Sequence, residues 1–434
     1  MNEIAQINGP VWRSDDEGYR AEVGGYQLAH PHRPDVVVGA TSPQDVARAV
    51  RHAADRGLPV AVQTSGHGRG TPLEGGVLIS TRRMAGVRVD PVARTARVEA
   101  GTRWTQVAEA AAAHGLAPLS GSSPAVGAVG YTLGGGIGVL ARTFGWASDR
   151  VRSVDLVTAD GQQRHVTAAA DPELFRVLRG AGAGLGVVTA MEVGLVPVGR
   201  LFGGALLVDG PHVPALLDAY REWTADLSHD VTSSITMLPF PDVAAVPDHL
   251  RGRYAAKVHI ACTGSVAEGE RLVAPLRAAV PLLADTLGEL PYTAAGTIFD
   301  DPTEPHAYTG TNAMLHALDP AVLHAALDVA GPDAPVMCVL GLRHLGGALA
   351  RPPAVPDAVA HRDAAYLLSV LSLVDGTEVP GRLHGELMQR VAPWTAGDTP
   401  NFRFGAQAAR DRPLDVPGRA ALVAELDPKG LFLP

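Results

Sequence analysis

Three clusters of glycine, within residues 63–70, 121–145 and 180–199, constrain this chain more than any other feature of its sequence. Glycine loses more conformational freedom on folding than other residues, so a cluster indicates places where the backbone turns sharply or approaches a ligand closely. Successive unobstructed backbone N–H groups can also hold a phosphate or pyrophosphate. Each cluster taken alone is also compatible with a flexible surface loop.

The first cluster reads QTSGHGRG and follows the apolar run 58-LPVAV-62, which places His67 in a loop directly after a predicted strand. Taken alone, this motif is more typical of a surface turn with a solvated imidazole. The second cluster, 121-GSSPAVGAVGYTLGGGIGVLARTFG-145, lacks the lysine of a P-loop and is not a convincing Rossmann fingerprint. On its residues alone it is a generic anion cradle or a flexible loop.

The composition excludes several classes of protein. The chain has 434 residues, 46% of them hydrophobic, which suffices for two or three domains with large cores. A formal net charge of -9, without basic clusters that contain interleaved aromatics, argues against nucleic-acid binding. The chain start lacks the pattern of a signal peptide, and no apolar run approaches the length of a membrane span. We therefore expect a cytoplasmic protein that binds neither nucleic acid nor membrane.

Strand and helix patterns alternate along the chain. The segment 42–57 predicts a helix with a serine cap and a proline in the first turn. From about residue 200, strand patterns alternate with alanine-rich helical stretches, which indicates a second α+β lobe. The other predicted elements are strands at 36–40, 59–63, 77–80, 95–101, 153–166, 204–210, 257–264 and 336–345 and helices at 104–114, 171–180, 211–223 and 320–331.

In their order and spacing, the three clusters resemble the FAD-linked oxidases of the vanillyl-alcohol oxidase and p-cresol methylhydroxylase superfamily. The chain looks closest to the berberine-bridge-like branch, which includes bacterial hydroxynicotine oxidase-like enzymes. The likeness extends to 401-NF-402 and 427-DPKGLF-432. It implies an α+β fold with a two-lobed FAD-binding domain of the p-cresol methylhydroxylase type at 1–198. A substrate domain at 199–395, whose antiparallel sheet covers the flavin, and a C-terminal return to the FAD-binding domain at 396–434 complete the implied fold.

The resemblance implies FAD held by one covalent bond, at His67. In the family, the histidine of the first loop carries the flavin through its 8α carbon. Many relatives form a second bond from a cysteine, whose place Ser123 takes, and a hydroxyl cannot replace a thiolate in that addition. The other positions that the resemblance assigns to FAD are Thr64, Ser65, Gly66, Gly68, Arg69, Gly70, Gly121, Ser122, Ser123, Val126, Gly127, Gly130, Tyr131, Gly134, Gly135, Gly136, Gly138, Gly186, Val187, Val188 and Asn401.

The resemblance also assigns chemistry. Val126 matches a position beside the reactive flavin carbon where oxidases tend to carry valine, which favours O2 as the electron acceptor. Tyr131 and Asn401 are the candidate catalytic residues, and a packed core aromatic is the alternative for Tyr131. Thr399 replaces the family's tail tyrosine, and its hydroxyl is too weak an acid to act as an ionised base near neutral pH. The catalytic base is therefore left open.

Other histidines could also reach a substrate. His259 and His344 lie on predicted strands of the second lobe, although hydrogen-bonded structural histidines are the more common case. The remaining histidines and the two cysteines, Cys262 and Cys338, have no spacing that completes a metal site, so we assign no metal.

These features predict an FAD-dependent oxidase that removes a hydride from a C–H next to an alcohol or amine carbon of a small metabolite. O2 would take the electrons and give H2O2. Because aromatic residues make up only 5% of the chain and the second lobe offers no obvious charged clamp, we expect an apolar or glycosylated substrate, from secondary metabolism. A redox-neutral flavin-dependent cyclase or pericyclase and a metabolite-binding protein without catalysis are the alternatives. Substrate identity and oligomeric state stay open.

Overall fold

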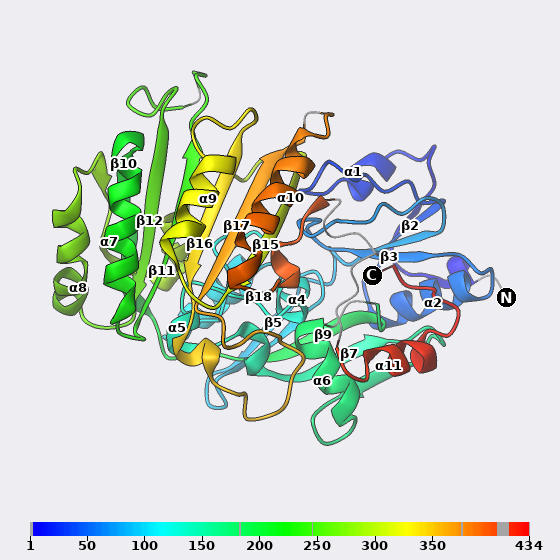
Figure 1. The fold of residues 1–434 in the computed structure, drawn as a ribbon. Coiled ribbons are helices and arrows are strands. Elements are labelled where there is room, and N and C mark those ends of the chain that lie inside the picture. The colour runs from blue at the N-terminus through cyan, green and yellow to red at the C-terminus, as the bar shows by residue number, and fades with distance from the viewer. Residues whose placement is uncertain (1–2, 182–183, 245, 375, 406–415, 434) are drawn as a thin grey trace.

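The structure, a computed structural model, describes residues 3–181, 184–244, 246–374, 376–405 and 416–433. The strands of these residues form three sheets. In Figure 1 the largest sheet stands at the left with helices in front of it, and the two smaller sheets lie to the right and below. Both chain ends lie at the right, beside the sheet that contains β2 and β3.

A four-stranded sheet forms near the N-terminus. β2, β4 and β3 are parallel and almost wholly buried, as their short apolar runs predict, and β1 is antiparallel to β2. α2 (Pro43–Ala54) connects β2 to β3 and begins as predicted, with the side chain of Ser42 accepting a hydrogen bond from the N–H of Asp45 at 3.2 Å. The strands in spatial order are β1 (Val11–Trp12), β2 (Val36–Gly39), β4 (Val77–Ser80) and β3 (Val60–Gln63).

A five-stranded antiparallel sheet follows, and one of the helices that cover it, α4, lies within the second glycine cluster. Buried residues of α3 (Trp104–Ala112), α4 (Ala128–Leu133) and α6 (Pro172–Ala181) form one hydrophobic core with it. The strands in spatial order are β5 (Val87–Asp90), β6 (Thr95–Glu99), β9 (Val187–Gly194), β7 (Val151–Val157) and β8 (Gln163–Val166).

The largest sheet has nine strands, and all its pairs are antiparallel. β14 (Gly288–Pro291) pairs with β10 beside the main path. The other strands in spatial order are β13 (Ala284–Asp285), β10 (Arg200–Asp209), β12 (Tyr254–Cys262), β11 (Val231–Pro239), β16 (Cys338–His344), β17 (Tyr366–Leu373), β15 (Tyr308–Leu315) and β18 (Thr395–Gly397). The helices packed against it are α7 (Val213–Ala225), α8 (Val266–Ala279), α9 (Pro320–Ala330) and α10 (Val379–Val391).

The two faces of this sheet differ in character because side chains alternate along each strand. Val258, Ile235 and Leu342 belong to the hydrophobic core that the sheet forms with its helices. The residues adjacent to these in sequence, His259, Ser234 and Arg343, lie on the opposite face. In the strand register, Ser234 of β11 lies opposite His259 of β12 and opposite Arg343 of β16. Further along the same row, Leu367 and Met314 pack against Ile137, Ala141 and Trp146, so this face meets the glycine-rich segment.

The C-terminal segment returns to the first sheet. After the turn Pro400–Phe402 and α11 (Arg419–Leu426), the N–H of Val60 donates to the carbonyl of Leu431 at 2.8 Å, and the N–H of Leu433 donates back at 2.8 Å. Phe432 joins the core of the four-stranded sheet. The division of the chain at 1–198, 199–395 and 396–434 stays a prediction.

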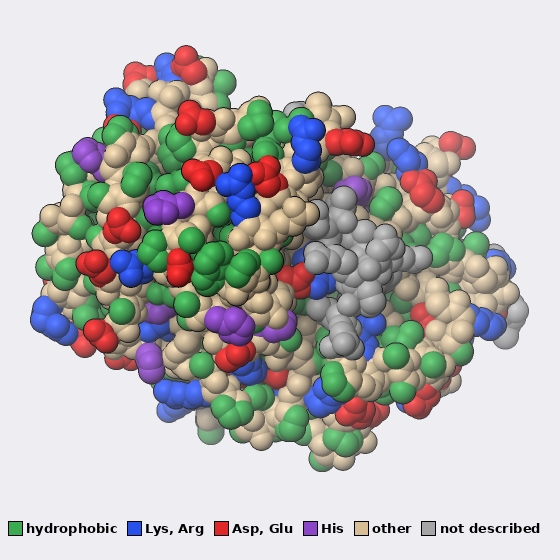
Figure 2. Space-filling view, in the orientation of Figure 1, with side chains coloured by type: hydrophobic (Ala, Val, Ile, Leu, Met, Phe, Trp, Pro, Cys, Tyr) green, Lys and Arg blue, Asp and Glu red, His purple; other side chains and the backbone are tan. Residues whose placement is uncertain are grey.

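The remaining short elements connect these layers. None of the helices in the described part of the chain has both the length and the apolar character needed to cross a bilayer. On the face shown in Figure 2, acidic and basic side chains are interspersed. The short helices are α1 (Tyr19–Val23), α5 (Ala141–Phe144) and the 3-10 turns Glu3–Gln6, Ala147–Arg150, Gly210–His212, Tyr292–Ile298, Gly347–Ala350, Ala392–Trp394 and Pro400–Phe402.

Candidate active site

The loop 64–70 after β3 offers a row of free backbone donors. Within the described chain, the N–H groups of residues 66–70 donate no hydrogen bond, while Tyr26 and Gln27 donate theirs to the carbonyls of Ser65 and Gly66 at 3.0 Å. Gly66 has φ +72°, and a Cβ there would lie 2.8 Å from the Cα of Gly25. Successive N–H groups in a tight, anchored turn suit an anionic pyrophosphate. The loop therefore fits a dinucleotide.

His67 is half-buried in this loop and held on three sides. Its ring stacks on Tyr26 with centroids 4.0 Å apart, its Nδ1 lies 2.9 Å from the hydroxyl of Ser65, and its carbonyl accepts from the hydroxyl of Tyr308 at 2.8 Å. Burial, with a smaller contribution from the positive charges of neighbouring side chains, lowers the pKa of His67 to about 4. The imidazole is therefore neutral at pH 7, and it stays neutral down to about pH 5, where a solvated imidazole would be protonated.

Hydrogen bonds bring the three glycine clusters together around this loop. The N–H of Gly127 donates to the hydroxyl of Ser65 at 3.3 Å, which joins the first cluster to the second. The hydroxyl of Thr64 donates to the carbonyl of Ala100 at 2.8 Å, and the N–H of Ala100 donates to the carbonyl of Thr189 at 3.0 Å. Thr189 belongs to β9, within the third cluster. Residues predicted from three distant segments thus form one site.

Some predicted FAD positions contribute through the backbone alone. The guanidinium of Arg69 points into the N-terminal segment, where it donates to the carbonyl of Val23 at 2.8 Å and to the side chain of Gln63. Val187 and Val188 are buried in the hydrophobic cores on either face of β9, so their side chains are not available to a cofactor. Their assignment to FAD stays a prediction that concerns their peptide groups.

Other predicted positions are open or half-open. A Cβ added at Gly68 or Gly130 would meet no atom within 4 Å. Val126 is half-buried, and its carbonyl accepts from the N–H of Trp104 at 3.2 Å. Its N–H lies 3.4 Å from the carbonyl of Ser123, which fixes the turn that follows Gly121 and Ser122.

Several glycines of the second cluster make room for Tyr131. A Cβ would lie 3.0 Å from the Tyr131 ring at Gly121 and 2.5 Å from it at Gly136. At Gly138 it would overlap the carbonyl oxygen of Ser120 and lie 3.1 Å from the Tyr131 hydroxyl. Burial raises the pKa of Tyr131 far above its usual value, so the phenol stays protonated near neutral pH. This placement favours the packed aromatic, and a catalytic role for its neutral hydroxyl stays a prediction.

Replacing Tyr131 by phenylalanine is expected to leave the free energy of unfolding unchanged or to raise it by up to about 1 kcal/mol, because the buried hydroxyl has no hydrogen-bond partner among the described residues. The matched control is Tyr292→Phe, whose hydroxyl lies 2.7 Å from that of Ser120 and donates to the carbonyl of Pro118 at 2.6 Å. The free energy of unfolding of Tyr292→Phe should be lower than that of the wild type by about 1–2 kcal/mol. Urea unfolding compares the two, and equal losses would contradict the expected difference.

The C-terminal return places Asn401 and Thr399 against the second cluster and the large sheet. The amide of Asn401 donates to the carbonyl of Tyr131 at 2.8 Å, and its oxygen occupies the space that a side chain at Gly134 would need. Thr399 is buried, and Asn312 of β15 clamps its peptide through bonds of 2.8 and 3.0 Å. Asn401 thus ties the tail to the end of α4, and its catalytic role stays a prediction.

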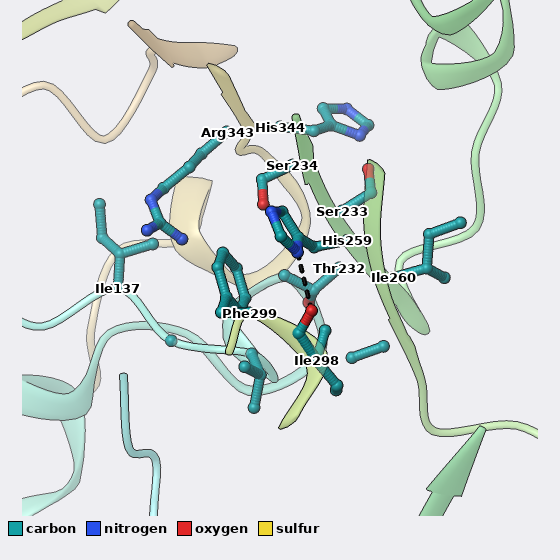
Figure 3. A pocket seen from close by; sticks show the side chains of 13 residues that line it. Ile137, Thr232, Ser233, Ser234, His259, Ile260, Ile298, Phe299, Arg343 and His344 are labelled. Atoms are coloured by element: carbon teal, nitrogen blue, oxygen red, sulfur yellow. Dashed lines mark hydrogen bonds between the residues drawn. The ribbon is translucent and has the colours of Figure 1, made fainter. Parts of the chain in front are cut away.

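A pocket lies between this glycine-rich segment and the face of the large sheet opposite α7, α8, α9 and α10 (Figure 3). His259 is buried there as a neutral imidazole: burial lowers its pKa to about 3, its Nδ1 donates to the carbonyl of Ile298 at 2.8 Å, and its Nε2 accepts from Thr236 at 3.1 Å. The lining residues are Ile137, Gly138, Val139, Thr232, Ser233, Ser234, His259, Ile260, Ala261, Ile298, Phe299, Arg343 and His344.

His344 is likewise held by neighbours. Its Nε2 accepts from Arg142 at 2.6 Å, its ring stacks on Tyr366, and burial lowers its pKa to about 3. The predicted hydrogen-bonded role of His259 and His344 is confirmed. Neither is protonated at pH 7, and no group of three or more His, Cys, Asp or Glu within the described residues is arranged to hold a metal ion.

Arg343 is the functional candidate that the sequence did not reveal. It is the single charged residue among those that line the pocket, and its guanidinium carbon lies 5.0 Å over the ring of Phe299 and 5.1 Å over that of Phe402. The expectation that the second lobe offers no obvious charged clamp did not take this residue into account. The sequence did contain a signal for its position. Val339, Gly341 and Arg343 alternate with buried residues along β16, and this period of two places them on one face of the strand.

Known proteins resemble this chain in sequence and fold. Residues 34–167 match a family model described as an FAD binding domain. An (R)-6-hydroxynicotine oxidase from Paenarthrobacter nicotinovorans is 34% identical over 265 residues, which span 59% of this chain and 58% of that protein. The crystal structure of 6-hydroxy-D-nicotine oxidase from Arthrobacter nicotinovorans matches with a TM-score of 0.83 at 25% identity, covering 98% of this chain and 96% of the other.

A more distant match extends the structural likeness. Berberine bridge enzyme from Eschscholzia californica has a TM-score of 0.79 at 17% identity and covers 100% of this chain and 96% of its own. At that identity the likeness concerns the fold alone. Together with the hydroxynicotine oxidase structure, it confirms the predicted α+β fold of the p-cresol methylhydroxylase type.

Proposed function

Because the chain belongs to the FAD-linked oxidoreductases of the vanillyl-alcohol oxidase and p-cresol methylhydroxylase superfamily, we propose that it is an FAD-dependent oxidase. It would oxidise a C–H next to an alcohol or amine carbon of a small metabolite and pass the electrons to O2, giving H2O2. The observation that carries the proposal is His67, a neutral, half-buried imidazole inside a loop of free backbone donors. We also propose a cytoplasmic location and a substrate from secondary metabolism, on the sequence features given above.

The residues around His67 would hold the cofactor. The N–H groups of 66–70 would bind its pyrophosphate, and His67 would carry the single covalent bond, since Ser123 offers no thiol for a second. Bound FAD would supply the hydride acceptor, while the protein supplies position and electrostatics. The stacked Tyr26 and the hydroxyl of Ser65 would fix the orientation of the imidazole before attachment.

The pocket beside Ile137 and Gly138 would take the substrate. Its side chains provide no group that titrates near pH 7, because both histidines are neutral and bonded and Tyr131 is held protonated. Thr399 cannot ionise in this range either. We therefore propose that the substrate proton leaves to water or through a neutral hydroxyl. The comparisons give no support to a redox-neutral cyclase over an oxidase.

The function is tested by anaerobic titration of the flavin-loaded protein with candidate alcohols and amines. An oxidase substrate bleaches the flavin, and admission of air restores the yellow colour with one H2O2 per flavin. A compound that is converted to product while the flavin stays yellow would show redox-neutral chemistry and would contradict the proposal.

Changing Val126 to leucine is expected to slow the reoxidation of reduced flavin by O2 at least about tenfold, on the order of 1.4 kcal/mol in the barrier, and to change flavin reduction less. The reason is steric, because the larger side chain would fill space beside the flavin carbon that reacts with O2. Val126→Thr keeps the volume and is the matched control. Stopped-flow absorbance measures flavin reduction and flavin reoxidation separately. Equal slowing of both would contradict a role of Val126 in the reaction with O2.

A further inference from the structure

The guanidinium of Arg343 is the one charged group among the residues that line the pocket. Among the described residues, it makes no hydrogen bond or ion pair, although the side chain lines the pocket from near the C-terminal end of β16. Figure 3 shows it on the side of the pocket where Ile137 and Phe299 lie. A guanidinium does not lose its proton in proteins, so the charge persists. Arg343 is half-buried, and a partly desolvated charge without a polar partner is stabilised by an anion.

The surroundings do not supply that anion. Asp301 is the acidic residue whose charge acts on Arg343, but it is exposed and forms no ion pair with it. Lys257, next to the pocket, is a second positive charge, and its Nζ donates to the carbonyl of Phe299 at 3.1 Å. His259 and His344 are neutral. The pocket therefore presents positive charge, with no acidic side chain among its lining residues.

The geometry favours an anion that is bound at the edge of the guanidinium. The rings of Phe299 and Phe402 lie over its carbon, so they occupy its faces and leave the N–H groups in its plane. Those N–H groups match the two oxygens of a carboxylate. The hydroxyl of Ser234, paired with Arg343 across the strands, is buried without a hydrogen-bond partner in the described part of the chain and can donate to the same ligand.

His259 holds this arrangement in place. Its ring stacks on Phe299 with centroids 4.2 Å apart at 11°, and both of its nitrogens are bonded. Because it is neutral, it positions the phenylalanine without adding charge.

We propose that Arg343 and Ser234 bind a carboxylate of the substrate, so that the substrate is a small carboxylate-bearing metabolite rather than an apolar or glycosylated one. This inference rests on the proposed function in taking the pocket as the substrate site. It concerns binding, however, and can be tested without turnover.

The test measures benzoate and acetate binding to the flavin-loaded full-length protein by calorimetry and thermal shift, with benzyl alcohol and acetamide as neutral counterparts. We expect the carboxylates to bind and the neutral compounds to bind at least about tenfold more weakly. Arg343→Met should weaken carboxylate binding at least about tenfold, Arg343→Lys less, and Ser234→Ala about threefold. Arg88→Met, which removes an exposed arginine of β5, should bind as the wild type does.

Failure of either carboxylate to bind the wild type, or equal binding by Arg343→Met, would overturn the inference. So would a change confined to the flavin reduction potential in Arg343→Met, since the anion would then be the reduced flavin. If Arg343→Met does not fold, Arg343→Lys decides by the same comparison. A protein that binds carboxylates through Arg343 but forms no H2O2 would refute the oxidase and leave this inference standing.

Discussion

Changing His67 to alanine is expected to abolish covalent flavin attachment completely while FAD still binds without a bond. The imidazole is the only part of the loop that the change removes, and the free N–H groups of 66–70 remain to hold the pyrophosphate. Acid precipitation of flavin-loaded protein separates the two cases, because the wild-type pellet should be yellow and the variant pellet colourless. Tryptic mapping should place the wild-type flavin on the peptide that contains His67.

The matched control for this prediction is His306→Ala. His306 also lies against Tyr26, with centroids 5.2 Å apart, but it is outside the glycine loop. Its pellet should stay yellow. A wild-type pellet without colour, or a flavin on any other residue, would refute the assignment of the bond to His67.

Changing Gly138 to alanine is expected to destabilise the protein by about 3 kcal/mol, because the new Cβ would overlap the carbonyl oxygen of Ser120 and press on the Tyr131 hydroxyl. The nearest atoms belong to the backbone of Ser120, so a rotamer change cannot relieve the overlap. Gly130, from the same glycine cluster, has no atom within 4 Å of its Cβ position and lies within α4. Gly130→Ala should raise the free energy of unfolding by about 1 kcal/mol.

Urea unfolding without added cofactor measures both variants, and equal stabilities would contradict the packing described here. The same pair also separates two roles for glycine. If Gly130 lets its backbone approach FAD, as the sequence predicts, Gly130→Ala should bind FAD more weakly despite its greater stability. If Gly130→Ala binds FAD with unchanged affinity, the space beside Gly130 is filled by solvent and not by FAD.

The sequence was informative where one local rule decides the structure. The buried strand Val60–Gln63 is an apolar run, and α2 begins where Ser42 and Pro43 indicate, so both were predictable. The glycine clusters predicted the meeting point of loops that are distant in the chain. The sequence could not show that Gly121, Gly136 and Gly138 make room for an aromatic ring, because that depends on tertiary contacts.

The substrate face was the part that sequence reasoning missed. β11 alternates threonine and serine with apolar residues, which is typical of a strand with one side in solvent. Here the polar side is covered by the glycine-rich segment instead, as the hydrogen bond of 3.2 Å from the N–H of Arg142 to the hydroxyl of Thr232 shows. Arg343 was overlooked for the same reason: periodicity tells which face a residue occupies but not what lies over that face.

The central claim, that this chain is an FAD-dependent oxidase, is tested most directly by the reaction of its reduced flavin with O2, which requires no known substrate. The flavin-loaded protein is reduced with light under anaerobic conditions and mixed with oxygenated buffer in a stopped-flow instrument, with free reduced FAD as the reference. We predict reoxidation faster than that of free FAD, with one H2O2 per flavin. Reoxidation no faster than that of free FAD, or a protein that retains no flavin, would contradict the claim.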